Sequence, residues 1–214
     1  MRKTIICIDR DGTLIHDTRE HLFLGRKDDW REKVRILPHA VEGLRLLNTI
    51  AGAGIYMITN QPGVAISDFP MLTEERAHEV CRYLVDLLKD EGANLDGYFL
   101  CPHATPEYAQ RKPGVNFHRH LVHDCHCLKP GLAMVFNALQ AEGVTPENAD
   151  VYVIGDRASD VRTALNLGGT GILIPFVNEP GESERVKKLE GQSRIQVSEN
   201  MLAAAEYIFS RIGA

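Results

Sequence analysis

Short apolar runs alternate along this chain with longer stretches of helical period, and this alternation restricts the possible folds more than any other feature of the sequence. Runs of this kind, bounded by turn residues, are typical of parallel strands buried between two layers of helices. We predict strands at residues 4–9, 55–59, 97–101, 151–155, 170–174 and 194–197. Predicted helices lie at about residues 40–50, 73–91, 131–142, 159–167 and 201–212. Because crossover connections are right-handed, this order predicts an α/β fold with one doubly wound parallel sheet.

Length and composition agree with one domain of this kind. The chain has 214 residues, 44% of them hydrophobic, and this is enough apolar surface for one sizeable core. We therefore expect a single Rossmann-like domain over residues 1–214, with helices on both faces of the sheet and no large cap domain between the motifs.

Charge and cysteine content restrict the partners and the compartment. A net charge of -5 without any basic run argues against binding of nucleic acid or of an acidic membrane surface. The apolar run before Asp9 is too short for a signal peptide, and no stretch is long enough to span a bilayer. Five cysteines, an odd number, are expected to be free or metal-bound in a reducing compartment. We expect a cytoplasmic monomer whose partner is a small molecule.

Polar clusters follow three of the predicted strands, where the ligand site of a doubly wound sheet is expected. They occupy residues 9–13 after the first strand, 59–63 after the second and 155–160 after the fourth. Two irregular stretches leave from the same edge, at about residues 16–35 and 102–126. Since long loops at this edge commonly carry function, we expect a flap over about 16–35 and a substrate-shaping loop over 101–127.

The first cluster, Asp9-Arg10-Asp11-Gly12-Thr13, places two carboxylates where a buried strand becomes a turn. One aspartate can attack phosphorus to form an aspartyl-phosphate, while the other protonates the departing alcohol and later deprotonates water. A divalent cation must offset the crowding of negative charge, and Asp156 and Asp160 would supply further oxygen ligands. Taken alone, an aspartate pair at a strand end is also common in ordinary turns.

Other polar groups could hold a phosphate at the same edge. Thr59 and Asn60 offer a hydroxyl and an amide at the end of the second strand, and Lys129 places an ammonium just before a predicted helix. Each of these groups also occurs in ordinary turns or on solvated surfaces. Their occurrence together is what indicates a phosphate site.

The order of the motifs is Asp-x-Asp-Gly-Thr, a strand-end threonine, a lysine and Gly-Asp-x-x-x-Asp, and it resembles the haloacid dehalogenase superfamily across nearly the whole chain. The resemblance implies a phosphatase with Asp9 as nucleophile and Asp11 as general acid and base. It also implies that Thr59 and Lys129 hold the phosphate. The implied Mg²⁺ ligands are Asp9, the main-chain carbonyl of Asp11, and Asp156, with Asp160 as a supporting carboxylate.

Three cysteines and a histidine form two short pairs, Cys101-Pro102-His103 and Cys125-His126-Cys127. Three thiolates and one imidazole are a ligand set of closed structural Zn²⁺ sites, and such a site would join the two ends of the loop. The other cysteines, Cys7 and Cys81, fall in a predicted strand and helix, where we expect core positions. Nearby histidines are alternative ligands, namely His118, His120, His123 and His126. We prefer Cys101, His103, Cys125 and Cys127, because this pattern resembles a zinc-bearing branch of the same superfamily.

That branch includes D-glycero-D-manno-heptose 1,7-bisphosphate phosphatases, which serve lipopolysaccharide-core or nucleotide-heptose synthesis, and the histidinol-phosphatase domain of histidine biosynthesis. The length and the Asn-Gln-x-Gly stretch after Thr59 resemble the first group. Residues 8–14 and 154–160 resemble the second at least as much. We expect the heptose bisphosphate as substrate, with histidinol phosphate or another small sugar or alcohol phosphate as the alternative.

The chain departs from both groups in a longer loop between the zinc pairs and in Leu128, where those relatives usually carry an arginine. Arg111, Lys112 and Arg119 of the loop could replace a lost substrate contact. Arg157, inside the last motif, is expected to bind a second polar or anionic group.

Rival classes explain less of the sequence. A phospho-acceptor module would receive phosphate at the end of its third strand, where this chain has Leu100 and Cys101. A P-loop kinase is disfavoured because no Gly-x-x-x-x-Gly-Lys-Ser/Thr run is present. A silent zinc-binding scaffold leaves the order of the acidic motifs unexplained.

Overall fold

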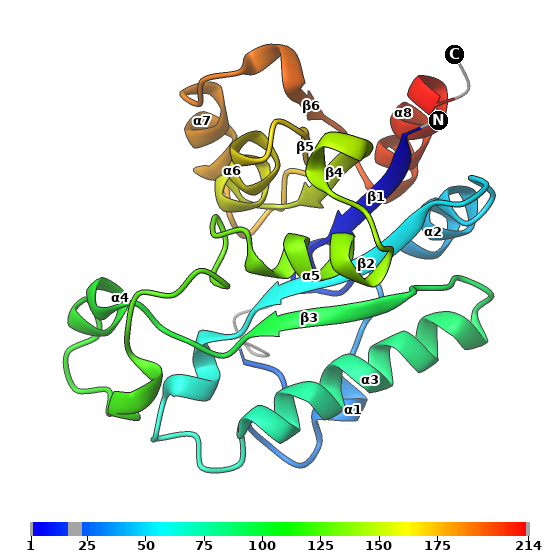
Figure 1. The fold of residues 1–214 in the computed structure, drawn as a ribbon. Coiled ribbons are helices and arrows are strands. Elements are labelled where there is room, and N and C mark those ends of the chain that lie inside the picture. Colours follow the sequence, from blue (N-terminus) through cyan, green and yellow to red (C-terminus); the bar gives the residue numbers. More distant parts are fainter. Residues whose placement is uncertain (1, 17–22, 213–214) are drawn as a thin grey trace.

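A computed structural model describes residues 2–16 and 23–212 of the chain. Six parallel strands form one sheet in the order β3-β2-β1-β4-β5-β6 (Figure 1). The strands are β1 (Lys3–Ile8), β2 (Gly54–Asn60), β3 (Gly97–Cys101), β4 (Ala149–Gly155), β5 (Thr170–Leu173) and β6 (Ile195–Val197). All the predicted strands are confirmed, with ends that differ by at most two residues. Because the strand order reverses beside β1, the carboxyl ends of β1, β2 and β4 border one crevice.

Helices lie on both sides of this sheet, as predicted. They are α1 (Trp30–Lys33), α2 (Ala40–Leu47), α3 (Glu74–Asp90), α4 (Pro106–Gln110), α5 (Ala133–Ala141), α6 (Ala158–Asn166), α7 (Glu182–Lys187) and α8 (Met201–Ile212). Short 3-10 turns span Pro62–Ala65, Arg119–Leu121, Pro146–Asn148 and Gln192–Arg194. The sequence prediction lacked α1, α4 and α7, because four to six residues are too few to show a helical period.

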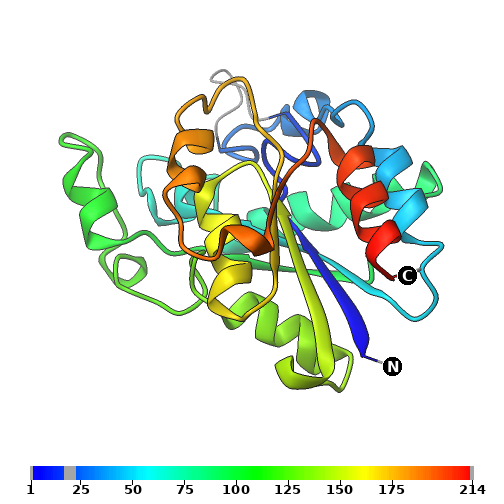
Figure 2. The same ribbon diagram turned by 90° about the horizontal axis from the view of Figure 1, so that it is seen from above.

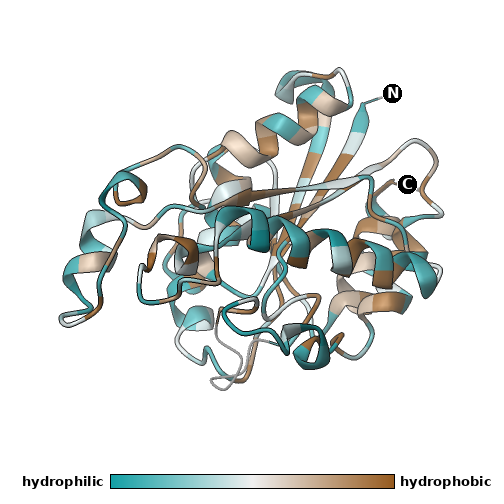
Figure 3. Ribbon diagram, turned by 90° about the horizontal axis from the view of Figure 1, so that it is seen from below, coloured by the Kyte–Doolittle hydropathy of each residue, from teal (hydrophilic) through white to brown (hydrophobic). Residues whose placement is uncertain are grey.

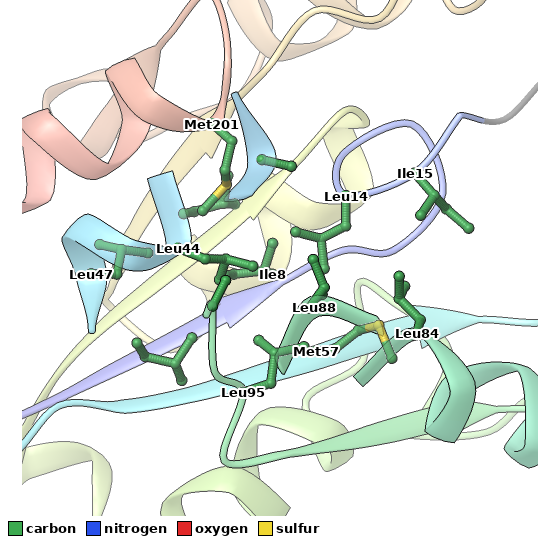
Figure 4. Packing of buried hydrophobic residues seen from close by; sticks show 14 of the residues in the cluster. Ile8, Leu14, Ile15, Leu44, Leu47, Met57, Leu84, Leu88, Leu95 and Met201 are labelled. Atoms are coloured by element: carbon green, nitrogen blue, oxygen red, sulfur yellow. The ribbon is translucent and has the colours of Figure 1, made fainter. Parts of the chain in front are cut away.

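Successive residues of each strand face opposite layers of helices. In β1, Ile6 and Ile8 point into a core that also contains side chains of α2, α3 and α8, whereas Ile5 and Cys7 point into a core with side chains of α5. Figure 4 shows part of the first core, where side chains of β1 and β2 meet those of these three helices. Figure 2 shows α2 and α8 side by side on that face. Strands that are apolar on both faces thus give the doubly wound sheet.

The helix α3 illustrates how local sequence sets these elements. The Oγ1 of Thr73 accepts a hydrogen bond of 3.1 Å from the backbone N–H of Arg76 and so caps the first turn. Val80, Leu84 and Leu88 recur at every fourth position and are buried, and Figure 3 shows the hydrophilic residues that alternate with them along this helix. The amphipathic period therefore fixes which side of α3 packs on the sheet. Cys81 lies in the same core, as expected.

Two long excursions leave the carboxyl edge of the sheet. In the first, Ile15 pairs with Ile36 at the base of the predicted flap, and Trp30 of α1 is buried in the core. Residues 17–22, which belong to the flap prediction, lie outside the described residues. The second excursion carries α4 beyond the end of β3 (Figures 1 and 2). Both pack against the sheet domain, and neither forms a separate cap domain within residues 2–16 and 23–212.

None of the helices in the described part of the chain combines the length and the apolar character that are needed to cross a membrane.

Candidate active site

An ammonium and two carboxylates meet at the carboxyl edge of the sheet. Asp9 follows β1, Asp160 lies in the first turn of α6, and Lys129 lies between β3 and α5. The Lys129 Nζ is 2.6 Å from an oxygen of Asp9 and 2.6 Å from an oxygen of Asp160, and it donates a 3.2 Å hydrogen bond to the carbonyl of Ile58. All three charged side chains are at least 90% buried. The chain thus holds a buried cation directly beside the predicted nucleophile.

This crowding changes how the acids ionise. Burial, and next the charges of Asp160 and Asp11, raise the pKa of Asp9 to about 6, although Lys129 acts in the opposite direction. Burial and the charges of Asp9 and Asp160 raise the pKa of Asp156 to about 9. Burial alone would lower the pKa of Lys129, but Asp160 and Asp9 raise it above its ordinary value. Lys129 therefore stays charged. Its single positive charge does not balance the negative charge that the acids around it would carry if all of them were ionised.

The surroundings of Asp156 fit a bound cation. Both of its carboxylate oxygens are buried and have no hydrogen-bond partner. Oxygens of Asp9, Asp156 and Asp160 lie within 4.8 Å of one another. At Gly12, where φ is +81°, a Cβ atom would come within 2.4 Å of the Asp156 Oδ2, so a glycine is needed there. The Asp156 Oδ2 has only a long ion pair, 3.9 Å from the Arg157 Nε. An all-oxygen donor set with buried carboxylate oxygens that accept no hydrogen bond fits a hard divalent cation such as Mg²⁺.

Asp11, the predicted acid and base, is held by two residues that the sequence reasoning did not single out. The Arg10 guanidinium is 1% exposed and contacts the Asp11 carboxylate through Nε at 3.1 Å and through Nη2 at 2.8 Å. The Gln61 Nε2 donates to the same carboxylate at 2.8 Å. A signal for Arg10 was present, because an arginine beside a buried strand needs a nearby counter-charge. For Gln61, the sequence offered only its position in the second polar cluster, residues 59–63, as an indication that it belongs to the site.

The side chains of Thr59 and Asn60, which were predicted to bind phosphate, form hydrogen bonds with other residues of the site. Thr59 is 1% exposed, and its Oγ1 accepts a 2.7 Å hydrogen bond from the Gln61 amide. The Asn60 side chain accepts from the Lys129 N–H at 2.9 Å and donates to the Lys129 carbonyl at 3.3 Å. Asn60 therefore fixes the backbone that carries the ammonium. Gln61 connects Thr59 with the carboxylate of Asp11.

The two cysteine and histidine pairs come together at the ends of the second excursion. Cys101, His103, Cys125 and Cys127 each offer a ligand atom within 4.8 Å of the others. The sulfur of Cys127 is 2.9 Å from that of Cys101, 3.3 Å from that of Cys125 and 3.1 Å from the His103 Nδ1. Tetrahedral thiolates around Zn²⁺ would lie about 3.8 Å apart, so this cluster has the size of a site for one ion. The structure thus brings the predicted ligand set together, and the cluster could hold zinc.

We expect metal analysis of the purified protein to find about one zinc ion per chain. Cys127→Ser should lose this ion and lower the Tm. In a chain of this size, each kcal/mol lost from the free energy of unfolding lowers the Tm by about 2–4 °C. His126→Ala is the matched control, because His126 is exposed and lies between two cluster residues without belonging to the cluster. A metal-free protein that is fully folded, or an equal loss of zinc in both variants, would contradict the zinc site.

A cavity of about 390 Å³ opens above these groups. Asp9, Asp11, Lys129 and Asp160 line it, together with Asn60 and Gln61. Arg157 also lines it; this side chain is 44% exposed and its Nη2 is 2.7 Å from an oxygen of Glu179. The volume is that of a site for a small molecule.

Comparisons with known proteins find a family model and curated relatives that are similar to this chain. A model of the family described as HAD-hydrolase-like matches residues 126–179, which include Lys129, Asp156 and Asp160. The chain is 30% identical over 168 residues to the histidine biosynthesis bifunctional protein HisB of Baumannia cicadellinicola, covering 78% of this chain and 40% of that protein. It is 33% identical over 172 residues to the HisB protein of Campylobacter jejuni, covering 80% and 42%. The chain therefore spans about two fifths of the length of these curated relatives.

Solved structures share the fold. A D,D-heptose 1,7-bisphosphate phosphatase from B. bronchiseptica, complexed with magnesium and phosphate, has a TM-score of 0.72 at 21% identity, covering 97% of this chain and 99% of that one. A putative HAD-like phosphatase from Mesorhizobium loti has a TM-score of 0.64 at 19% identity, covering 97% and 88%. The family match over residues 126–179, the relatives and the shared fold confirm the resemblance to the haloacid dehalogenase superfamily that the motifs predict.

Proposed function

We propose that this protein is a Mg²⁺-dependent phosphomonoester hydrolase that acts through an aspartyl-phosphate on Asp9. The observation that carries this proposal is the buried contact between Asp9 and Lys129, which both line an open cavity, beside the Asp156 carboxylate, whose oxygens accept no hydrogen bond. A carboxylate in this place is close to a fixed positive charge and accessible to a small substrate. Both conditions are needed for attack on a phosphate ester.

In the first step, a carboxylate oxygen of Asp9 forms a bond to phosphorus while the bond from phosphorus to the ester oxygen breaks. Asp11, in its protonated form, gives its proton to the departing alkoxide. In the second step, water attacks phosphorus, Asp11 takes a proton from it, and the bond to Asp9 breaks to release inorganic phosphate. Lys129 stabilises the negative charge of the phosphoryl oxygens, and Thr59 is proposed to assist at the same end.

Asp9, the main-chain carbonyl of Asp11, and Asp156 would hold Mg²⁺, and Asp160 would support them through Lys129. When bound, the ion neutralises charge on the phosphate and on the carboxylates. Arg10 and Gln61 orient the Asp11 carboxylate, because both contact it directly.

For the substrate we propose D-glycero-D-manno-heptose 1,7-bisphosphate, in carbohydrate metabolism that leads to lipopolysaccharide. Support comes from the heptose bisphosphate phosphatase whose fold matches nearly all of both chains. The second candidate is histidinol phosphate, which the identity to HisB proteins favours. We also propose that the chain acts as a cytoplasmic monomer with one catalytic domain over residues 1–214.

A screen of phosphate esters, with and without Mg²⁺, tests this function. We expect hydrolysis only with the metal, and a higher kcat/KM for the heptose bisphosphate than for histidinol phosphate. A preference for histidinol phosphate would select the second candidate. A protein that hydrolyses no ester under either condition would overturn the proposed function.

Mg²⁺ should raise the Tm, and it should do so more at pH 8 than at pH 6. The folded-state pKa of Asp156 is raised from 3.8 to about 9 and that of Asp9 from 3.8 to about 6. These two groups therefore stabilise the metal-free fold most below pH 3.8. This contribution to stability is lost as the pH rises through their raised pKa values. An ion offsets this loss where the acids are ionised, and at lower pH it must displace a proton.

Thermal unfolding at both pH values, with and without Mg²⁺, measures this difference. Asp156→Asn should remove most of the Mg²⁺-induced shift, whereas Asp150→Asn, a change at a half-exposed surface ion pair, should keep it. Equal shifts at pH 6 and pH 8 would contradict the assignment of Asp156 as a ligand.

A further inference from the structure

His103 belongs to two sites at once. It is part of the cysteine and histidine cluster (Cys101, His103, Cys125 and Cys127), and it also lines the active-site cavity. Its Nδ1 is 3.1 Å from the sulfur of Cys127 and 3.6 Å from that of Cys101, so Nδ1 is the ring nitrogen that a zinc ion at this cluster would bind. The other ring nitrogen, Nε2, has no hydrogen-bond partner among the described residues. The cluster thus leaves one polar atom of this imidazole without a partner in the fold.

Metal binding would fix the form of the His103 imidazole. A neutral imidazole that binds a metal through Nδ1 carries its proton on Nε2, so Nε2 is then a hydrogen-bond donor and not an acceptor. The second nitrogen of a metal-bound histidine usually donates to a carboxylate, a backbone carbonyl or water. Since no described residue accepts from the His103 Nε2, an acceptor that enters the cavity can take this place.

The pairing of two strands places this imidazole next to the acid of the proposed reaction. Cys101, at the end of β3, pairs with Asn60 of β2 (Figure 1), and the Gln61 N–H donates to the Cys101 carbonyl at 2.7 Å. The side chain of the same Gln61 contacts Asp11 at 2.8 Å. Because Asp11 is proposed to protonate the departing alcohol, the alcohol part of the substrate must lie near this strand end. His103, two residues after Cys101, is therefore a neighbour of the leaving group and not of the reacting phosphate.

The chain around His103 is held by contacts within the second excursion. The Ala104 N–H donates to the Leu121 carbonyl at 3.0 Å, and the Ala104 carbonyl accepts from the His123 N–H at 3.1 Å. The His123 ring lies against the His103 ring, with the ring centres 4.4 Å apart. A donor that is held in place before binding loses little conformational entropy when the ligand arrives. The imidazole is therefore suited to orient a ligand.

We propose that the His103 Nε2–H donates a hydrogen bond to a hydroxyl oxygen in the alcohol part of the substrate, while its Nδ1 serves the cysteine and histidine cluster as a metal ligand. The inference rests on the proposed function and names a residue that selects the leaving group. A donor in this place favours a polyhydroxy alcohol over one that presents an ammonium group, which can only donate. The contact adds no chemical step, because it acts through binding and orientation.

His103→Cys separates the donor from the metal ligand. Four thiolates are also a ligand set of structural Zn²⁺ sites, so this variant should keep about one zinc ion per chain while it loses the Nε2–H. The loss of one hydrogen bond predicts that kcat/KM for heptose 7-phosphate falls by about 3- to 10-fold, mainly through KM. Hydrolysis of phenyl phosphate, whose ring carries no hydroxyl group, should change by less than about 2-fold. Metal analysis and steady-state kinetics measure these effects.

His120→Ala is the matched control, because His120 is an exposed histidine of the same loop that does not line the cavity. It should match the parent protein on both esters. Equal losses on the two esters in His103→Cys, or an unchanged KM for heptose 7-phosphate in a variant that keeps its zinc, would overturn the proposal. A loss in His120→Ala as large as in His103→Cys would do the same.

Nuclear magnetic resonance tests the contact without turnover and without a change in the cluster. The sample is the zinc-loaded Asp9→Asn variant with isotope-labelled histidine, in which the His103 Nε2–H signal is assigned by its loss on adding His103→Cys. We expect this signal to shift when heptose 7-phosphate binds and to stay in place when inorganic phosphate binds. No shift with the heptose ester, or the same shift with inorganic phosphate, would refute the contact even if His103→Cys loses its zinc.

This binding measurement also separates the contact from the proposed function. If the parent protein hydrolyses no ester, the proposed function fails. The contact at His103 is then still decided by the signal of its Nε2–H, because the Asp9→Asn variant needs only to bind the heptose ester and not to hydrolyse it.

Discussion

Asp9→Asn should reduce kcat by about 10⁴-fold or more while the protein remains folded, because an amide cannot form the aspartyl-phosphate. The side chain keeps its size, and the substitution removes one of the buried carboxylates that crowd Lys129 and Asp156. Lys129 keeps its contact with Asp160. We therefore expect a Tm equal to or above that of the parent protein. Steady-state kinetics and thermal unfolding measure the two effects.

Asp150→Asn is the matched control, because Asp150 is a half-exposed aspartate that pairs with Arg2 on the surface. It should keep full activity. A beryllium or aluminium fluoride mimic of phosphate should bind against Asp9 in the parent protein. Substantial activity in Asp9→Asn, or a mimic bound elsewhere, would show that the nucleophile is misassigned.

Lys129→Met should lose both activity and stability, the latter by about 3–5 kcal/mol. The substitution removes the ammonium that contacts Asp9 and Asp160, and leaves the buried carboxylates of the site without this counter-charge. Since Lys129 holds the pKa of Asp9 down, its loss should raise that pKa further. The stability deficit should therefore be larger at pH 8 than at pH 5, where the acids can protonate. Denaturant unfolding at both pH values tests this.

Two further variants show whether the loss of stability in Lys129→Met comes from unpaired buried charge. Lys89→Met, at an exposed lysine near the end of α3, should change stability by about 0.5 kcal/mol or less. Adding Asp160→Asn to Lys129→Met should recover part of the lost stability but none of the activity, because it removes one unpaired charge. A deficit that is the same at both pH values, or no recovery in the double variant, would argue against electrostatic crowding as its cause.

The sequence by itself determined the elements that depend on local pattern. The continuous apolar run of β1 and the period of α3 fix strand and helix, and parallel strand order then brings Asp9, Thr59 and Asp156 to one edge. The two cysteine and histidine pairs could likewise be recognised because their ligands are neighbours in sequence. For these residues, the local pattern and the topology rules are sufficient.

Only the tertiary structure decided which side chains pair across the site. Arg10 contacts Asp11, Asp160 shares the Lys129 ammonium with Asp9, and Asn60 holds the Lys129 backbone. The placement of Arg111 and Lys112 in the cavity also depends on α4, a helix of five residues. Such contacts join residues far apart in the chain, and their geometry depends on packing and on the cost of burying charge, which no local pattern records.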